Sequence, residues 1–373
     1  MIESPVKHIA VLIPNLNGGG AERVTANLIA ALVRRGVEVD LLLIRAEGPN
    51  LSRIPPQVRI IELAANRTLL AARPLAAYLK QHRPAALLAV MDSAAVVAAV
   101  AKRLARVDTR IVAVLHNATV MRAAAKVPLH DKWLPIALRS QLWLADAVVA
   151  VSQGLAEEQR ELFPWLRSKV QVIYNPVVTA ELLQKALDPP DHPWLQPDQP
   201  PVVVGMGRLC AAKDFATLIQ AFALLVRTRP VRMLLYGDGE LRAELLAQVA
   251  ALGLQDSVQL PGWTDQSAAV LRHAAVFALS SEYEALPTVL IEALACGTQV
   301  VATDCRFGPR EILQDGQLGP LVATRDAPAL AAALAKALDQ PIAAARLQQR
   351  AQDFSESVCT AQYLQVLLAE LPA

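Results

Sequence analysis

Short apolar runs alternate with helical patterns along this chain, and a proline-rich interval divides the alternation into two series. The strand-like runs of the first series are His8–Ile13, Val37–Ile44, Ala86–Val90, Arg110–His116, Ala147–Ser152 and Lys169–Ile173. Those of the second series are Val202–Met206, Val231–Tyr236, Val258–Leu260, Val276–Leu279 and Gln299–Thr303. Strands that alternate with helices over short connections are typical of parallel sheets covered by helices. We therefore predict an α/β fold of two doubly wound, Rossmann-like domains with a ligand cleft between them.

The proline-rich interval sets the expected domain boundaries. Six prolines lie between Asp188 and Pro201, a composition typical of a linker. We expect an N-terminal domain at 1–180, a linker at 181–201, a second domain at 202–355 and a C-terminal helix at 356–373.

Charge is divided unevenly between the two halves. Residues 1–180 carry 22 Lys and Arg against 13 Asp and Glu, a balance of +9, and residues 181–373 carry 14 against 21, a balance of −7. A basic half suits an anionic substrate or an anionic membrane surface.

The composition indicates the cellular compartment in which we expect the protein. The four cysteines show no metal-ligand spacing, which indicates a reducing environment and no bound metal. The longest apolar region, 85–101, is interrupted by Asp92 and Ser93, so we do not expect it to span a membrane. No signal peptide pattern opens the sequence. We expect a soluble or surface-bound cytoplasmic protein.

Two glutamates flank a predicted helix start in the second half. Glu284 lies in a loop after an apolar run, a helical pattern begins at Thr288, and Glu292 lies about one turn inside it. Gly297 suits a left-handed helix end. Free backbone N–H groups at a helix start bind anions, although acidic residues there often only offset the helix dipole.

Other motifs at strand ends favour an anion-binding site at this helix start over a purely structural role for the two glutamates. Arg208 and Lys213 follow one strand, and together their cationic groups suit a pyrophosphate. Gly18, Gly19 and Gly20 follow the first strand of the chain and allow close backbone approach to a ligand. Neither motif is a complete dinucleotide fingerprint or a Walker sequence, so a dinucleotide oxidoreductase is the least favoured class.

Three further residues occupy strand ends. Gly237 follows one strand, Trp263 follows the next and suits stacking on a base or core packing, and His116 ends a strand of the first half.

The order of these motifs resembles glycosyltransferase family 4, a family of retaining GT-B enzymes. The matching segments are Gly-Gly-Ala-Glu-Arg (19–23), Gly-Arg-Leu with Lys-Asp (207–214), Gly-Asp-Gly (237–239), and Glu284 with Glu292-Ala and Gly297. The residues at 286–297 and 308–311 resemble the sequences of enzymes that assemble bacterial surface polysaccharide and lipopolysaccharide. The resemblance implies that the C-terminal helix returns to the N-terminal, acceptor-binding domain, and that the second domain binds a nucleotide sugar.

The resemblance also implies roles for individual residues. Arg208 and Lys213 would hold the diphosphate, Glu284 would contact the donor sugar, and Glu292 would bind the ribose. The remaining donor-site positions would be Gly18, Gly19, Gly20, Gly237, Trp263, Leu286, Thr288 and Val289, and His116 would line the sugar site.

We thus expect a metal-independent hexosyltransferase that moves a hexose or N-acetylhexosamine from a UDP-sugar to a glycan or lipid-linked acceptor, with no nucleic-acid partner. Ala285 stands where the family commonly has Gly, which leaves the donor sugar open. A GT-B epimerase or phosphorylase and a catalytically silent nucleotide-sugar binder are the alternatives.

A basic and aromatic segment, 121–143, suggests a membrane surface. Arg122, Lys126, Lys132 and Arg139 interleave there with Trp133 and Trp143. A covered helix with a solvated basic face explains the pattern equally well.

Overall fold

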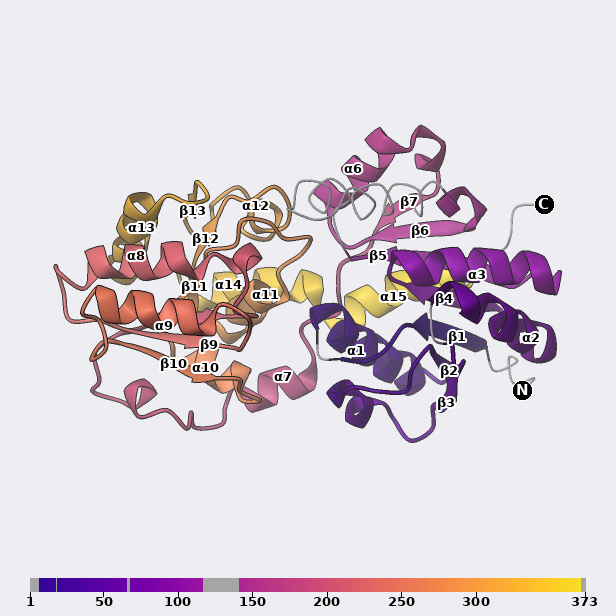
Figure 1. The fold of residues 1–373 in the computed structure, drawn as a ribbon, viewed down its shortest axis with the longest axis horizontal. Helices are drawn as coiled ribbons and strands as arrows, with labels where there is room; N and C mark the ends of the chain where they lie inside the picture. Colours follow the sequence, from indigo (N-terminus) through magenta and orange to yellow (C-terminus); the bar gives the residue numbers. More distant parts are fainter. Residues whose placement is uncertain (1–6, 18, 66–67, 117–140, 370–373) are drawn as a thin grey trace. The chain divides into compact units, whose positions relative to one another are not determined.

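The computed structural model describes residues 7–17, 19–65, 68–116 and 141–369 (Figure 1). The chain forms two compact units, one of Met1–Pro176 with Glu356–Ala373 and one of Val177–Ser355. Each unit is a parallel sheet with helices on its faces, which confirms the expected α/β architecture.

The first unit contains a seven-stranded sheet in the order β3-β2-β1-β4-β5-β6-β7. The strands are β1 (His8–Ile13), β2 (Glu38–Leu43), β3 (Arg59–Glu62), β4 (Ala86–Val90), β5 (Arg110–Leu115), β6 (Ala147–Ala150) and β7 (Val170–Val172). The helices are α1 (Gly20–Arg34), α2 (Ala72–His82), α3 (Asp92–Ala105), α6 (Gln153–Leu162) and α15 (Glu356–Leu367). The strand order reverses between β1 and β4, and the carboxyl ends of strands at such a reversal are where doubly wound folds commonly bind ligands.

The second unit contains a six-stranded parallel sheet in the order β10-β9-β8-β11-β12-β13. The strands are β8 (Val202–Met206), β9 (Arg232–Tyr236), β10 (Val258–Gly262), β11 (Val276–Leu279), β12 (Gln299–Thr303) and β13 (Leu321–Val322). The helices are α7 (Ala180–Lys185), α8 (Phe215–Leu225), α9 (Arg242–Ala251), α10 (Ser267–His273), α11 (Thr288–Cys296), α12 (Pro309–Ile312), α13 (Ala327–Asp339) and α14 (Ala344–Ala351). Here the order reverses between β8 and β11.

The core of each unit follows from the strand composition. The last five residues of β1, Ile9–Ile13, are fully buried, as expected for a strand covered on both faces. In the second unit Phe222 of α8 is fully buried with Leu235 of β9 and Leu334 of α13 in one cluster. Side chains of Ala, Leu and Val supply most of these contacts, in line with the low aromatic content.

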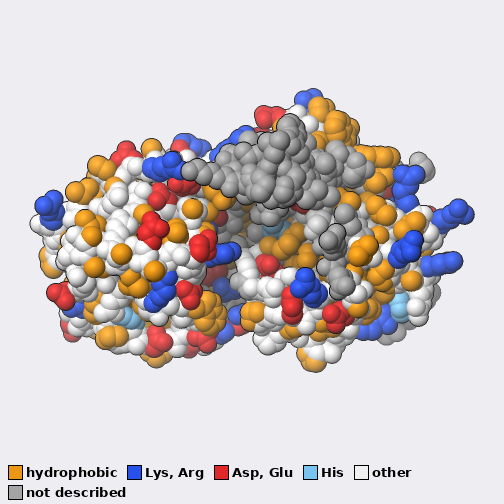
Figure 2. All heavy atoms as spheres, in the orientation of Figure 1, with side chains coloured by type: hydrophobic (Ala, Val, Ile, Leu, Met, Phe, Trp, Pro, Cys, Tyr) orange, Lys and Arg blue, Asp and Glu red, His pale blue; other side chains and the backbone are white. Residues whose placement is uncertain are grey.

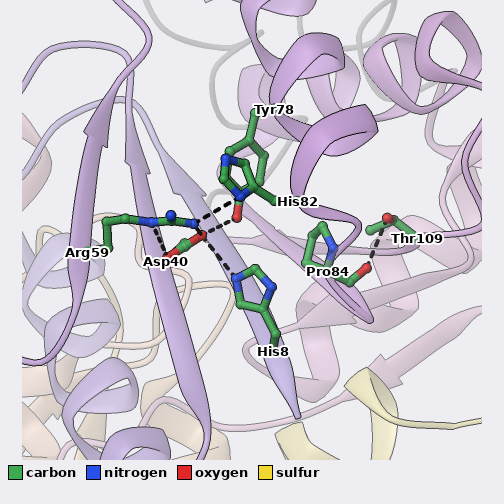
Figure 3. A network of polar contacts seen from close by, with 7 residues as sticks. All are labelled: His8, Asp40, Arg59, Tyr78, His82, Pro84 and Thr109. Carbon is green, nitrogen blue, oxygen red and sulfur yellow. Dashed lines mark hydrogen bonds and ion pairs between the residues drawn. The ribbon is translucent and has the colours of Figure 1, made fainter. Parts of the chain in front are cut away.

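A buried carboxylate ties three strands of the first unit to α2 (Figure 3). Asp40 accepts hydrogen bonds from Arg59 (Nε to Oδ1, 2.9 Å) and from the Tyr78 hydroxyl (2.5 Å), and its Oδ2 lies 3.0 Å from Nε2 of His8. Burial alone would raise the pKa of Asp40, but the donors from Arg59, Tyr78 and His8 outweigh it and hold that pKa below its usual value.

The domain boundary differs from the expected one. The first crossing between units falls after Pro176, and the interval 181–201, expected as a linker, lies inside the second unit. Its aromatic residue explains why: Trp194 packs under the guanidinium of Arg232, 4.8 Å from the ring centroid, so this proline-rich stretch docks on the sheet.

Helix α15 belongs to the first unit. It packs against α1, β4 and β5, and Nε of Arg110 donates to the Val366 carbonyl at 2.7 Å. Most of the basic and aromatic segment 121–143 lies outside the described residues, and its last residues begin a short 3-10 helix, η3 (Gln141–Leu144).

Candidate active site

Two loops meet where the strand order of the second unit reverses. The loop after β8 (207–214) and the loop after β11 (280–287) follow neighbouring parallel strands. The backbone N–H of Glu282 donates to the Ala212 carbonyl at 2.9 Å, and the Ser280 hydroxyl donates to the Lys213 carbonyl at 2.7 Å. The main chain thus holds the two loops together.

The side chains of Lys213 and Glu284 form an ion pair across these loops. Nζ of Lys213 lies 2.5 Å from Oε1 of Glu284, and the Ser281 hydroxyl donates to the same oxygen at 2.7 Å. The Lys213 side chain is only 23% exposed and the Glu284 side chain only 12% exposed. The sequence therefore identified a cation and an acid that the fold places in direct contact.

Arg208 lies apart from this pair. Its guanidinium is 73% exposed and bonds Oε2 of Glu240 at 3.1 Å rather than the Lys213–Glu284 pair. Arg208 lies on the same loop as Lys213, but in this structure the two cations do not converge as the motif spacing suggested. An exposed pair of this kind contributes little to stability, so the Arg208 side chain is free to reorient toward an anion.

Helix α11 begins and ends where the sequence predicted. It starts at Thr288 after Pro287, with no side-chain cap on its first N–H groups, and Gly297 closes it at φ 75°. Leu286 is buried, so the backbone of this turn rather than that side chain is available to a ligand. An uncapped helix start beside a Lys–Glu pair is chemically suited to a phosphate.

Glu292 projects from α11 into a buried position. Its side chain is 4% exposed, and the Ser267 hydroxyl of α10 lies 3.4 Å from its Oε2. Cys296, one turn along the same helix, has a thiol whose pKa is raised to about 12 by burial and by the charge of Glu292. The Cys296 thiol therefore stays protonated near pH 7.

Gly237 and Trp263 mark the ends of β9 and β10. The N–H of Gly237 donates to the Gly262 carbonyl at 2.8 Å, so the two strand ends are joined. The Trp263 side chain is 77% exposed, which excludes the core-packing alternative and leaves its indole open to a ligand.

The predicted residues of the first unit follow the carboxyl ends of its strands β1 and β5. Gly19 precedes α1 and Gly20 is its first residue, whereas Gly18 lies outside the described residues. His116 follows β5 and lines a small pocket with Asn175 and Tyr363. Burial lowers the pKa of His116 to about 4, so its imidazole is neutral near pH 7.

The serines beside Glu284 and Glu292 were not predicted from the sequence to belong to the site. Ser280 and Ser281 are each 1% exposed, and Ser267 contacts Glu292. The available signal was the Ser-Ser pair directly before Glu284, since buried serines beside a charge usually donate to it.

Residues 7–17, 19–65, 68–116 and 141–369 contain neither a metal-binding cluster nor a membrane-spanning helix. No three His, Cys, Asp or Glu side chains gather there as they would around a metal ion. No helix in those ranges is both long and apolar enough to cross a bilayer.

Two families match this chain. Residues 18–181 match Glycosyltransferase Family 4, and residues 191–354 match the Glycosyl transferases group 1 family.

Named relatives are similar over parts of their length. The lipopolysaccharide core biosynthesis glycosyltransferase LpsE of Rhizobium meliloti is 34% identical over 231 residues, which cover 60% of this chain and 65% of LpsE. An N-acetylgalactosaminyltransferase of Campylobacter jejuni that acts on a diphospho-undecaprenol-linked glycan is 33% identical over 48% of this chain and 47% of its own. The matches thus span about half to two thirds of these curated relatives.

A solved structure matches nearly the whole chain. HepE from Anabaena, in complex with UDP and glucose, superposes with a TM-score of 0.77 and covers 98% of this chain and 100% of its own. At 22% identity this likeness establishes the shared fold.

Proposed function

The chain belongs to glycosyltransferase family 4 and has the GT-B fold, and on that basis we propose that it transfers a sugar from a nucleotide donor in the assembly of a cell-surface glycan. The observation that carries the proposal is the Lys213–Glu284 pair beside the uncapped start of α11. It puts a cation, a carboxylate and free N–H groups at one sheet edge, as a sugar diphosphate requires.

The proposed donor is a UDP-linked hexose or N-acetylhexosamine. HepE was solved with UDP and glucose, and LpsE is named for lipopolysaccharide core biosynthesis, so both favour a donor and a product of this class. The acceptor would be a glycan or a lipid-linked glycan, in keeping with the undecaprenol-linked substrate in the name of the Campylobacter relative.

The proposed mechanism divides the work among four side chains. Lys213 and Arg208 neutralise the diphosphate as it leaves, and this positive charge lets the reaction proceed without a metal. Glu292 accepts hydrogen bonds from the ribose hydroxyls. Glu284 holds the donor sugar so that the acceptor hydroxyl reaches the anomeric carbon on the face from which the diphosphate departs. The departing diphosphate takes the hydroxyl proton, and the new bond keeps the configuration of the old one.

Donor binding and transfer test this proposal separately. We expect UDP and one UDP-sugar to raise the melting temperature of the purified protein, with ADP and GDP as controls. UDP release should then depend on a glycan acceptor, and the anomeric configuration of the product should be retained. Binding without acceptor-dependent release would favour a silent nucleotide-sugar binder, and donor turnover without acceptor would favour an epimerase.

We propose further that the first unit docks on an anionic membrane. The side chains of Trp143 in η3 and Trp165 in η4 (Pro164–Leu166) are 50% and 53% exposed. These two 3-10 helices contact each other. Leu104 of α3, which contacts η3, is 58% exposed. Lys169 donates to the Trp143 backbone carbonyl at 2.7 Å, which adds a positive charge to this part of the surface.

Tryptophan with lysine and arginine is typical of surfaces that lie at a bilayer interface. Lys and Arg side chains also line the right-hand edge of the first unit in Figure 2. Most of the segment that first suggested this surface, 117–140, lies outside the described residues, so the proposal rests on η3, η4 and α3.

Vesicle flotation tests the docking surface. Wild-type protein should float with phosphatidylglycerol vesicles and not with phosphatidylcholine vesicles, and Trp143→Ser with Trp165→Ser should reduce flotation. Trp263→Ser, which removes an even more exposed indole from the second unit, is the control. Equal flotation of the double variant and wild type would contradict the assignment.

A further inference from the structure

The two oxygens of Glu284 have different surroundings. Oε1 accepts hydrogen bonds from two donors, Nζ of Lys213 at 2.5 Å and the Ser281 hydroxyl at 2.7 Å. Among the described residues, no donor lies within hydrogen-bonding distance of Oε2. One edge of the carboxylate is therefore fixed by the protein, and the other is open to a ligand.

We expect only one of the two donors to Oε1 to remain when a donor substrate binds. A diphosphate carries more negative charge than one carboxylate, so it should draw the Lys213 ammonium away from Glu284. Lysine also has a long, flexible side chain that reorients readily. If Lys213 were the sole restraint, Glu284 would lose its orientation at the moment the sugar arrives.

Ser281 is held in place independently of Lys213. Its side chain is 1% exposed, and its carbonyl accepts a hydrogen bond from the Thr303 hydroxyl at 2.6 Å. Thr303 ends β12, the strand next to β11, so the restraint comes from the sheet itself. A serine side chain also has a single rotatable bond to fix, so it loses little entropy in holding the carboxylate.

We propose that Ser281 is a positioning residue for the donor sugar. It holds Oε1 of Glu284 after Lys213 has turned to the diphosphate, and thereby keeps Oε2 directed at a sugar hydroxyl. This inference rests on the proposed function, since it takes a nucleotide diphosphate sugar as the ligand. It assigns the sugar-binding part of affinity to Ser281 and the diphosphate-binding part to Lys213.

The neighbouring serine provides a matched comparison. Ser280 is equally buried, but its hydroxyl donates to the backbone carbonyl of Lys213 at 2.7 Å, whereas the Ser281 hydroxyl donates to Glu284. Loss of the Ser280 hydroxyl should loosen the Lys213 loop and weaken every nucleotide alike. Loss of the Ser281 hydroxyl should weaken only ligands that carry the sugar.

The test measures the dissociation constants of UDP, UDP-glucose and UDP-N-acetylglucosamine for wild type, Ser281→Ala and Ser280→Ala. We expect Ser281→Ala to bind UDP as wild type does and to bind the preferred UDP-sugar about tenfold more weakly, the usual effect of losing a hydrogen bond to a charged group. Ser280→Ala should leave the ratio of the UDP-sugar and UDP constants unchanged. In a Glu284→Gln background, Ser281→Ala should change that ratio little, because its effect passes through the carboxylate.

Several results would overturn the inference. Ser281→Ala that weakens UDP and UDP-sugar equally, or changes neither, would show a purely structural serine. Wild-type protein that binds none of the three ligands would refute the proposed function as well, whereas wild-type binding with an unchanged ratio in the variant refutes the inference alone. If Ser281→Ala fails to fold, Ser281→Cys, which nearly keeps the volume with a weaker donor, should show the same pattern at smaller size.

Discussion

The backbone of Gly237 lies directly against the carbonyl group of Gly207. A Cβ atom built on Gly237 would come within 1.9 Å of that oxygen, and the φ of Gly237 is 131°. The turns after β8 and β9 therefore pack with no room for a side chain. Because Arg208 follows Gly207 directly, this contact fixes the start of the loop that carries both predicted diphosphate ligands.

Gly237→Ala should accordingly disturb the donor loop. We expect a loss of about 2 kcal/mol or more in the free energy of unfolding, because the methyl group meets backbone rather than a flexible side chain. UDP binding should weaken in the same variant, measured by calorimetry. Urea unfolding of wild type and Gly237→Ala measures the difference in the free energy of unfolding.

Gly253→Ala is the control for backbone conformation alone. Gly253 also has a positive φ, 67°, but nothing lies within 4 Å of a Cβ built there. It should cost about 1 kcal/mol and leave UDP binding intact. Equal loss of UDP binding in the two variants would contradict the packing argument.

Lys213 and Glu292 should be required for turnover but not for folding. Lys213→Ala removes the partly buried cation beside Glu284, and Glu292→Gln removes the buried carboxylate while keeping its shape. We expect each to lower kcat/KM for the UDP-sugar by about 100-fold or more, since each removes a charge or acceptor aimed at the reacting donor.

Lys185→Ala is the matched control for the lysine. Lys185 pairs with Glu181 on α7 at 2.7 Å and is 44% exposed. Its removal should change neither turnover nor stability measurably, as is usual for surface pairs. Full activity of Lys213→Ala would remove that residue from the site.

Much of the second unit could be predicted from its sequence. The helical pattern from Thr288 and the glycine at 297 predicted α11 to the residue, because apolar spacing and a left-handed end are local signals. Strand β3 of the first unit was missed, since three of its four residues are exposed at the sheet edge and it shows no buried run.

The contacts within the site could not be predicted from local sequence patterns. Lys213 and Glu284 are 71 residues apart, and they meet because β8 and β11 are neighbours in the sheet, which is a property of topology. The same holds for Arg208, whose partner Glu240 follows β9 rather than β11. Motif spacing identified the chemical groups, and strand order decided which of them meet.

His116 should make the stability of the protein depend on mildly acidic pH. Its pKa is lowered by burial from 6.5 to about 4, so the folded state favours the neutral imidazole and the unfolded state binds a proton first. Stability is therefore fully present above about pH 6.5 and falls as pH drops toward 4. Urea midpoints measured between pH 7.5 and pH 4.5 should show a steeper fall for wild type than for His116→Gln.

The exposed His273 of α10 provides the comparison. His273→Gln should retain the wild-type pH dependence. A His116→Gln profile that parallels wild type across this range would refute the burial of a neutral imidazole at this position.

Asp40 should stabilise the first unit by a term that disappears in acid. Asp40→Asn keeps the shape but removes the charge that Arg59, Tyr78 and His8 surround, and should cost about 3 kcal/mol at pH 7, as loss of one partner of a buried pair usually does. Because the folded pKa lies below 3.8, this stabilisation is present above about pH 4 and is lost as pH falls through the folded pKa. The difference in unfolding free energy between wild type and Asp40→Asn should thus shrink between pH 5 and pH 2. Glu62→Gln, which removes an exposed carboxylate from the adjacent β3, should show no such difference at any pH, and a constant gap for Asp40→Asn down to pH 2 would contradict the network as the source of stability.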